Sequence, residues 1–168
     1  MLAEADTIVI DEISMVRADL FEMIDAICKV ILWSDEPFGG KQLVLVGDCF
    51  QLPPVVKEQE EELFRTKYQS PFFFDSSSFY QLRVTTIELQ YIYRQQDQEF
   101  IKALNAMRLG VQEERITDYL NGACIDSFEE LPSQTIVVST TRKIANFLNQ
   151  KLLTELNEET QHTEAVVK

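Results

Sequence analysis

The sequence predicts an α/β fold in which helices flank a parallel β-sheet. Two short, unbroken apolar runs, TIVI at residues 7–10 and QLVLV at residues 42–46, are typical of strands buried on both faces. Residues 17–33 lie between these runs and carry apolar side chains at helical spacing. A strand, a helix and a second strand in this order predict a βαβ unit, whose right-handed crossover joins two parallel strands.

The helix of this crossover is expected to pack through one apolar stripe. After the helix, Pro37 and the Gly39-Gly40 pair predict a turn that ends the connection before the second strand. The stripe consists of Leu20, Met23, Ile24, Ile27, Val30 and Ile31.

The rest of the chain predicts further elements of both kinds. Residues 57–69 read as a charged, solvated helix or loop, and the aromatic cluster at residues 71–79 predicts packing. Two more strands are expected at residues 85–90 and 135–140. Three further helices are expected: one with the stripe Phe100, Ile101, Leu104 and Met107 before a cap at Gly110, one at residues 114–121, and one at residues 141–156. The polar tail, residues 157–168, is expected to fray.

Composition excludes several classes of function. The 168 residues suffice for one domain, or two small ones, with a hydrophobic core, and a net charge of −13 argues against a basic clamp for nucleic acid. Three distant cysteines and the single histidine, His162, fit neither a disulfide framework nor a zinc site. No apolar stretch approaches ~20 residues and no secretory signal is recognisable, so no membrane partner is expected.

The first candidate site is Asp11-Glu12, directly after the first predicted strand. Ligands of open α/β sheets gather at the carboxyl ends of strands. An aspartate there can hold Mg²⁺, directly or through water, and a neighbouring glutamate can orient or deprotonate an attacking water. This is the pattern of a Walker B strand, although an Asp-Glu pair after a strand is also found in ordinary acidic turns.

The second candidate is GDCFQLPPV, residues 47–55, directly after the second predicted strand. Gln51 does not titrate, but its amide can hydrogen-bond a phosphate oxygen or a nucleophilic water. Pro53 and Pro54 restrict the backbone, so a shift at Gln51 would be passed on along the chain. The alternative is a structural turn in which the glutamine caps a carbonyl.

The third candidate is YIYRQQDQEF, residues 91–100. The guanidinium of Arg94 can grip a phosphate through two hydrogen bonds and stabilise charge that develops in phosphoryl transfer. The alternative is an ordinary surface ion pair.

The order and spacing of these segments resemble the Pif family (petite-integration-frequency helicases) of superfamily-one DNA helicases, which are relatives of RecD. The family pattern contains DEISM, then F-G-G-x-Q running into GD-x-x-QLPPV, then YRQ-x-D-x-x-F leading to L-N-x-x-R-x-G. Here these motifs occupy residues 11–15, 38–55 and 93–110, and residues 139–153 look like the start of the family's second lobe. The resemblance covers about residues 5–155.

The resemblance implies an incomplete P-loop NTPase (RecA-like) fold. Residues 1–83 would form the C-terminal part of the first lobe, and residues 84–168 the start of the second lobe. Its cofactors would be ATP and Mg²⁺: Asp11 would coordinate Mg²⁺ with Glu12 nearby to activate water, and Gln51 would sense the γ-phosphate. Gly47 and Asp48 would shape the loop of Gln51. Arg94 would reach the γ-phosphate from the cleft between the lobes.

The implied function is ATP-driven translocation on DNA and unwinding, in repair, recombination, or replication and telomere maintenance. Its partners would be single-stranded and forked duplex DNA. The expected compartment is the bacterial cytosol, or the nucleus or mitochondrion of a eukaryote.

The sequence contains no G-x-x-x-x-G-K-[ST] motif, which cradles phosphates in this class of enzyme. We therefore expect an internal segment of a longer helicase, inactive by itself, whose exposed sheet edges favour self-association. Two alternatives remain: a non-catalytic interaction module derived from an NTPase fold, and a RecD-like exonuclease subunit.

The other conspicuous residues are expected to serve packing. Trp33 and the phenylalanines at residues 72–74 are assigned to the core rather than to stacking on bases. Cys49 is expected to fill a small apolar space beside the glutamine motif. For Phe50, a place in the core and a place near the DNA path are both open.

Overall fold

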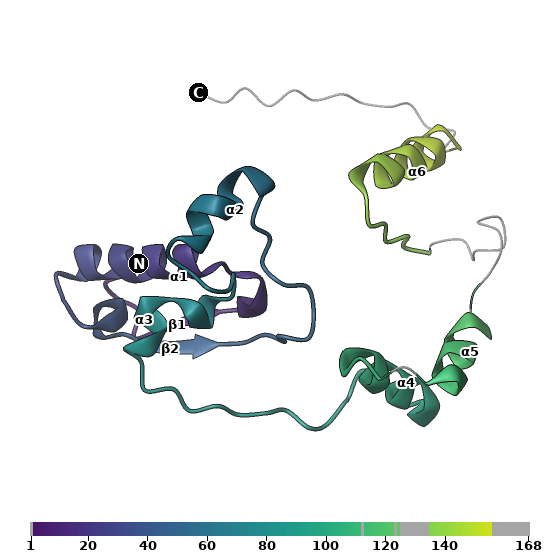
Figure 1. Ribbon diagram of the computed structural model, residues 1–168, viewed down its shortest axis with the longest axis horizontal. Coiled ribbons are helices and arrows are strands. Elements are labelled where there is room, and N and C mark those ends of the chain that lie inside the picture. The colour runs from purple at the N-terminus through teal and green to yellow at the C-terminus, as the bar shows by residue number, and fades with distance from the viewer. Residues whose placement is uncertain (1, 112, 123, 125–134, 156–168) are drawn as a thin grey trace. The chain divides into compact units, whose positions relative to one another are not determined.

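The computed structural model describes residues 2–111, 113–122, 124 and 135–155 (Figure 1). The chain divides into two units, Met1–Gly122 and Ala123–Lys168, and each is described by itself.

The first unit is built on a two-stranded parallel sheet. Strand β1 (Thr7–Ile10) pairs with β2 (Gln42–Leu45), with Thr7 opposite Gln42 and Ile10 opposite Leu45. This pairing confirms the two predicted strands and the βαβ unit.

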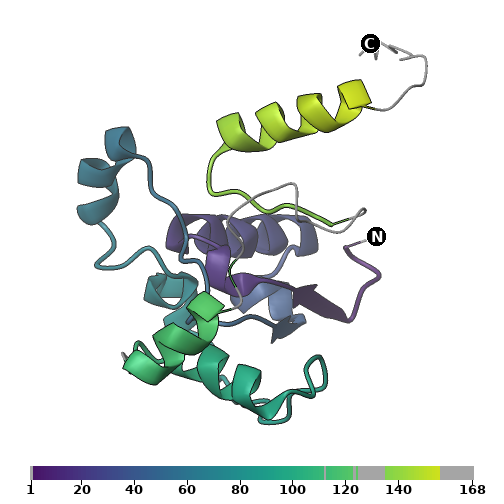
Figure 2. The ribbon, with the colours of Figure 1, turned by 90° about the vertical axis from the view of Figure 1, so that its right-hand side faces the viewer.

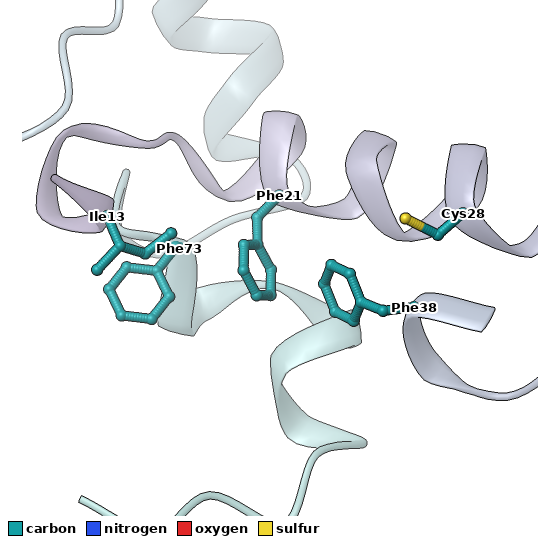
Figure 3. Packing of buried hydrophobic residues seen from close by; sticks show 5 residues of the cluster. All are labelled: Ile13, Phe21, Cys28, Phe38 and Phe73. Carbon is teal, nitrogen blue, oxygen red and sulfur yellow. The ribbon is translucent and has the colours of Figure 1, made fainter. Parts of the chain in front are cut away.

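Helix α1 (Ala18–Leu32) makes the crossover and covers one face of the sheet (Figures 1 and 2). The core between them contains Ile13, Phe21, Cys28, Phe38 and Phe73, against which the inward side chains of both strands pack. Figure 3 shows the ring of Phe21 between those of Phe38 and Phe73, at centroid distances of 5.0 and 5.7 Å. The predicted role of the aromatic cluster at residues 71–79 in packing is therefore confirmed at Phe73.

The prediction of which face of α1 is buried is largely wrong. The buried residues are Ala18, Phe21, Asp25 and Cys28, whereas most of the predicted stripe is exposed among the described residues. The helix is apolar on both faces, so periodicity could not decide which face meets the sheet. The assignment of Trp33 to the core is also wrong: its side chain is 95% exposed, because it occupies the left-handed residue that ends α1.

The Phe-Gly-Gly sequence forms a tight turn that is anchored by one buried carboxylate. Phe38, Gly39 and Gly40 have φ of 53°, 66° and 78°, and the turn η2 (Pro37–Gly40) buries Phe38 completely. The backbone N–H of Phe38 donates to Oδ1 of Asp25 at 2.6 Å. Lys29 and Ser78 donate to the other oxygen, each at 2.8 Å. Burial acts to raise the pKa of Asp25, but these hydrogen bonds outweigh it and lower that pKa.

A second carboxylate, Glu22, joins α1 to the segments that follow the glutamine motif. They are the turn that follows α2 (Glu58–Arg65) and the first residue of α3 (Ser77–Tyr80), a helix that the short helix η3 (Phe73–Asp75) precedes. Glu22 accepts hydrogen bonds from the Lys67 ammonium, from the Tyr68 hydroxyl at 2.7 Å, and from the backbone N–H and hydroxyl of Ser77 at 2.8 and 2.7 Å.

The remaining helices confirm three predictions. Helix α4 (Gln98–Arg108) is capped by the Asp97 carboxylate, which accepts from the N–H of Glu99 and of Phe100, and Gly110 follows it with φ of 67°. Helix α5 (Glu114–Gly122) completes the first unit, and α6 (Arg142–Glu155) belongs to the second. The tail at 157–168 lies outside the described residues.

The strands predicted at residues 85–90 and 135–140 are wrong. Both stretches are described, and neither is a strand, although both are rich in β-branched residues. Such residues favour a strand only where a neighbouring strand completes the ladder. No helix in the described part of the chain has the length and apolar character that a membrane span requires.

The Phe-Gly-Gly turn predicts that Gly39→Ala is strongly destabilising. A Cβ there would lie 2.4 Å from Cδ1 and 2.9 Å from Cβ of Leu32, in addition to the positive φ. We expect a loss of at least about 2 kcal/mol in the free energy of unfolding, measured by urea denaturation. Gly110→Ala is the matched control, because its φ is +67° and nothing lies within 4 Å of the added Cβ. We expect Gly110→Ala to lower the free energy of unfolding by about 1 kcal/mol. Equal losses in the two variants would contradict the steric explanation.

The Glu22 cluster predicts a pH-dependent stability. Burial acts to raise the pKa of Glu22, but the hydrogen bonds from Lys67, Ser77 and Tyr68 outweigh it and lower the pKa from 4.5 to about 2. The folded state thus binds this proton less readily than the unfolded state, so the stabilisation is complete above pH 4.5 and is lost as the pH falls toward 2.

We expect Glu22→Gln to lower the urea midpoint at pH 6 and to converge with the wild type as the pH approaches 2. Glu62→Gln, in an exposed position of α2, controls for the loss of one negative charge. A Glu22→Gln deficit that stays constant over this pH range would refute the role of the carboxylate.

Candidate functional site

Both strands end at the same edge of the sheet, and the first two motifs begin there. Asp11 and Glu12 follow β1 directly, and the glutamine motif begins at Gly47, just beyond β2. The N–H of Ile13 donates to the carbonyl of Val46 at 3.0 Å, and this bond ties the two loops together. The sheet edge at the carboxyl ends of both strands, where the site was predicted, is therefore present.

Glu12 adopts a left-handed backbone conformation, with φ of 52° and ψ of 39°. Its N–H donates to Oδ1 of Asp11 at 2.9 Å, and its carbonyl accepts from Met15 at 3.0 Å, which starts the short helix η1 (Ile13–Met15). The turn buries Ile13 and Ser14 and leaves Asp11 and Glu12 exposed. A non-glycine residue held in this conformation costs on the order of 1–3 kcal/mol, and such residues gather at functional sites.

Gly47 allows the two loops to lie against each other. A Cβ at this position would come within 3.0 Å of Cγ2 of Ile13 and 3.1 Å of the backbone nitrogens of Ile13 and Ser14. A larger residue would separate the Asp11-Glu12 turn from the glutamine loop.

Asp48 organises the loop that presents Gln51. Its Oδ1 accepts from the N–H of Phe50 at 3.0 Å, and its Oδ2 accepts from the side-chain amide of Gln51 at 3.3 Å. The N–H of Gln51 also donates to the Asp48 carbonyl at 3.0 Å. Gln51 is exposed whereas Pro54 is buried, so the second proline fixes the loop to the body of the unit.

The geometry bears on three expectations about this loop, those for Gln51, Cys49 and Phe50. The Gln51 side-chain amide donates to the Asp48 carboxylate, and among the described residues it does not cap a carbonyl. Cys49 is exposed, so its predicted role as an apolar filler is wrong: it lies in a surface turn, between Asp48 and the Phe50 N–H that donates to the Asp48 carboxylate. Phe50 is 59% exposed and is not part of the core.

Arg94 is not brought to this edge by any contact in the described residues. It is exposed, it lies in the irregular segment before α4, and within the described part of the chain it forms no hydrogen bond or ion pair. Asp11, Glu12 and the base of the Gln51 loop are thus assembled, whereas a meeting with Arg94 stays a prediction.

The donor set at the edge fits a magnesium ion that is shared with a phosphate. No group of three or more metal-binding side chains occurs among the described residues, so a closed protein cage is absent there. Mg²⁺ typically takes one or two carboxylates and completes its shell with water and substrate phosphates. Asp11, with Glu12 beside it, offers such exposed oxygen ligands.

One contact residue was missed from the sequence. Arg108, in the last turn of α4, lies with Nη2 3.6 Å from Oδ1 of Asp48 and with Cζ 4.8 Å from the centroid of the Phe50 ring. It belongs to the quoted motif LNAMRLG, but helical spacing marks it only as a surface position.

Comparison with known proteins gives consistent matches. The family description "PIF1-like helicase" matches residues 1–118. The human ATP-dependent DNA helicase PIF1 is 42% identical over 113 residues, which are 67% of this chain and 16% of that protein. The Campylobacter jejuni ATP-dependent DNA helicase Pif1 is 37% identical over 158 residues, which are 93% of this chain and 33% of that protein.

Solved structures agree with this match. The Pif1 helicase from Bacteroides, in complex with ADP-AlF3 and single-stranded DNA, has a TM-score of 0.85 and 34% identity over 94% of this chain and 37% of its own. The Pif1 helicase from Candida albicans has a TM-score of 0.74 and 31% identity over 94% of this chain and 34% of its own.

These matches confirm the expected RecA-like α/β fold, present as a partial domain. The chain spans about a third or less of the curated relatives given above. The matches favour the helicase interpretation over the RecD-like exonuclease subunit. The chain belongs to the PIF1-like helicase family.

Proposed function

We propose that this chain is a segment of an ATP-dependent DNA helicase, which couples ATP hydrolysis to translocation and unwinding. The observation that carries this proposal is the close approach of two loops at one sheet edge. Gly47 lets the Gln51 loop lie against the Asp11-Glu12 turn, as one bound phosphate would require. Relatives named ATP-dependent DNA helicases support it.

In this proposal each polar group has a distinct role. Asp11 holds Mg²⁺, which when bound neutralises charge on the phosphates, and Glu12 accepts a proton from the attacking water. Gln51 hydrogen-bonds the γ-phosphate or the water and loses that partner when the phosphate leaves. Arg94 approaches the γ-phosphate from a second lobe, with the boundary between the lobes at residues 83 and 84.

The proposed partners are single-stranded and forked duplex DNA. One solved structure shows Bacteroides Pif1 bound to single-stranded DNA. Another is described as the structural basis for unwinding of forked duplex DNA by two coordinating Pif1 helicases. The net charge of −13 requires that DNA contacts come from a few local groups rather than from a broad basic surface. We place the protein in a DNA-containing compartment and its work in repair, recombination or replication.

The buried hydroxyl of Ser14 indicates that a further polar group belongs at this site. Ser14 is 1% exposed, and its Oγ has no hydrogen-bond partner among the described residues. A buried hydroxyl without a partner is costly, so a donor or acceptor from another segment is expected here.

Glu12→Gln tests the proposed chemistry in the longer protein that carries this chain together with a phosphate-binding loop. We expect DNA-stimulated kcat for ATP hydrolysis to fall by at least about 100-fold, because the amide cannot accept the proton. KM for ATP should change little. Glu62→Gln is the matched control on an exposed helix.

The isolated 168-residue chain should show no DNA-stimulated phosphate release above background. A Glu12→Gln variant with wild-type kcat, or rapid hydrolysis by the isolated chain, would contradict the proposal. If neither the wild-type longer protein nor its Glu12→Gln variant hydrolyses ATP, the result would favour the non-catalytic interaction module.

The uncovered face of the sheet predicts self-association of the isolated chain. Val9 is 63% exposed and Val44 is 39% exposed, and both lie on the face opposite α1. We expect size-exclusion chromatography with light scattering to give a dimer or larger species, and the double substitution Val9→Lys with Val44→Lys to shift it toward monomer. Val55→Lys, at a loop position that is 75% exposed, is the control. A monomeric wild-type chain would count against this expectation.

A further inference from the structure

Arg108 contacts the glutamine loop from helix α4 at two points. Its Nη2 lies 3.6 Å from Oδ1 of Asp48, and its Cζ lies 4.8 Å from the centroid of the Phe50 ring. The roles proposed above for the nucleotide site do not involve this residue.

The carboxylate that Arg108 meets is the one that orients Gln51. Oδ1 of Asp48 accepts from the N–H of Phe50 at 3.0 Å, and Oδ2 accepts from the Gln51 side-chain amide at 3.3 Å. Asp48 is only 27% exposed, so its charge is partly shielded from solvent. A displacement of Arg108 would therefore act on the two groups that hold Gln51, the carboxylate and the adjacent backbone.

Helix α4 joins this contact to the segment of Arg94. The helix begins at Gln98, four residues after Arg94, and the Asp97 carboxylate caps its first turn. Its 11 residues form a rod of about 16 Å, with Arg108 in the last turn. Because successive turns of a helix are joined by backbone hydrogen bonds, we expect a shift at its start to reach Arg108.

We propose that Arg108 is a positioning residue that anchors the Gln51 loop to α4, so that movement of the Arg94 segment is transmitted to Gln51. The inference deepens the proposed function and rests on it. An arginine suits this task because one planar guanidinium can pair with a carboxylate and lie over an aromatic ring at the same time. A lysine would keep the charge but lose the flat face.

The test compares Arg108→Gln with Lys102→Gln in the longer protein. Lys102 is a matched control because it is a cation of the same helix that pairs with Glu99, at 2.9 Å, and not with the loop. We expect Arg108→Gln to lower DNA-stimulated kcat per nucleotide-binding site about tenfold, with KM for ATP within about twofold. Lys102→Gln should keep the wild-type kcat, and Arg108→Lys should fall between.

Wild-type kcat in Arg108→Gln, or equal losses in both glutamine variants, would overturn the inference. If the two glutamine variants have the same thermal unfolding midpoint, a difference in the fraction of folded protein does not explain the difference in kcat.

A second measurement separates this inference from the proposed function. In the isolated chain, Arg108→Gln should shift the NMR signals of the Gln51 side-chain amide and the Phe50 backbone amide, whereas Lys102→Gln should leave them in place. If the wild-type longer protein does not hydrolyse ATP, the proposed function fails and this measurement alone decides whether Arg108 anchors the loop. Unchanged Gln51 and Phe50 signals in Arg108→Gln would overturn the anchoring.

Discussion

The parallel pairing of β1 with β2 is the constraint on which the rest of this structure depends. Antiparallel strands would place their following loops at opposite ends of the sheet. Parallel strands place the Asp11-Glu12 turn and the Gln51 loop at one edge, and the bond from Ile13 to Val46 holds them there. A parallel pair needs a crossover, and here α1 and the Phe-Gly-Gly turn provide it.

Buried and half-buried carboxylates fix the parts that this pairing requires. Asp25 holds the Phe-Gly-Gly turn, Glu22 joins α1 to the segments beyond the glutamine motif, and Asp48 shapes the glutamine loop itself. Each carboxylate accepts several hydrogen bonds, which offset the cost of removing its charge from water. Some acidic side chains of this chain therefore hold defined parts of the fold, whereas others only interact with solvent at the surface. The Phe-Gly-Gly signature belongs to this framework, since its residues form the turn rather than contribute reacting groups.

The sequence predicted the elements whose signals are local. Two apolar runs identified β1 and β2, and capping residues such as Asp97 and Gly110 marked the ends of α4. Features that depend on distant partners were not predictable in the same way. The buried face of α1 was misassigned because both of its faces are apolar. Residues 85–90 were misassigned because no strand in the described part of the chain pairs with them. Arg108 was missed because its contacts with Asp48 and Phe50 come from a loop more than 50 residues away along the chain.

In the proposed function, Glu12, Gln51 and Arg94 surround the terminal phosphate of ATP. The most direct test is the affinity of the longer protein for magnesium ADP with aluminium fluoride, which stands in for the transferred phosphate, measured by titration calorimetry beside magnesium ADP alone. We predict that Gln51→Ala and Arg94→Ala each weaken binding of the fluoride complex at least about tenfold and leave ADP binding within about twofold. Equal affinity of the wild type and both variants for the fluoride complex would contradict it.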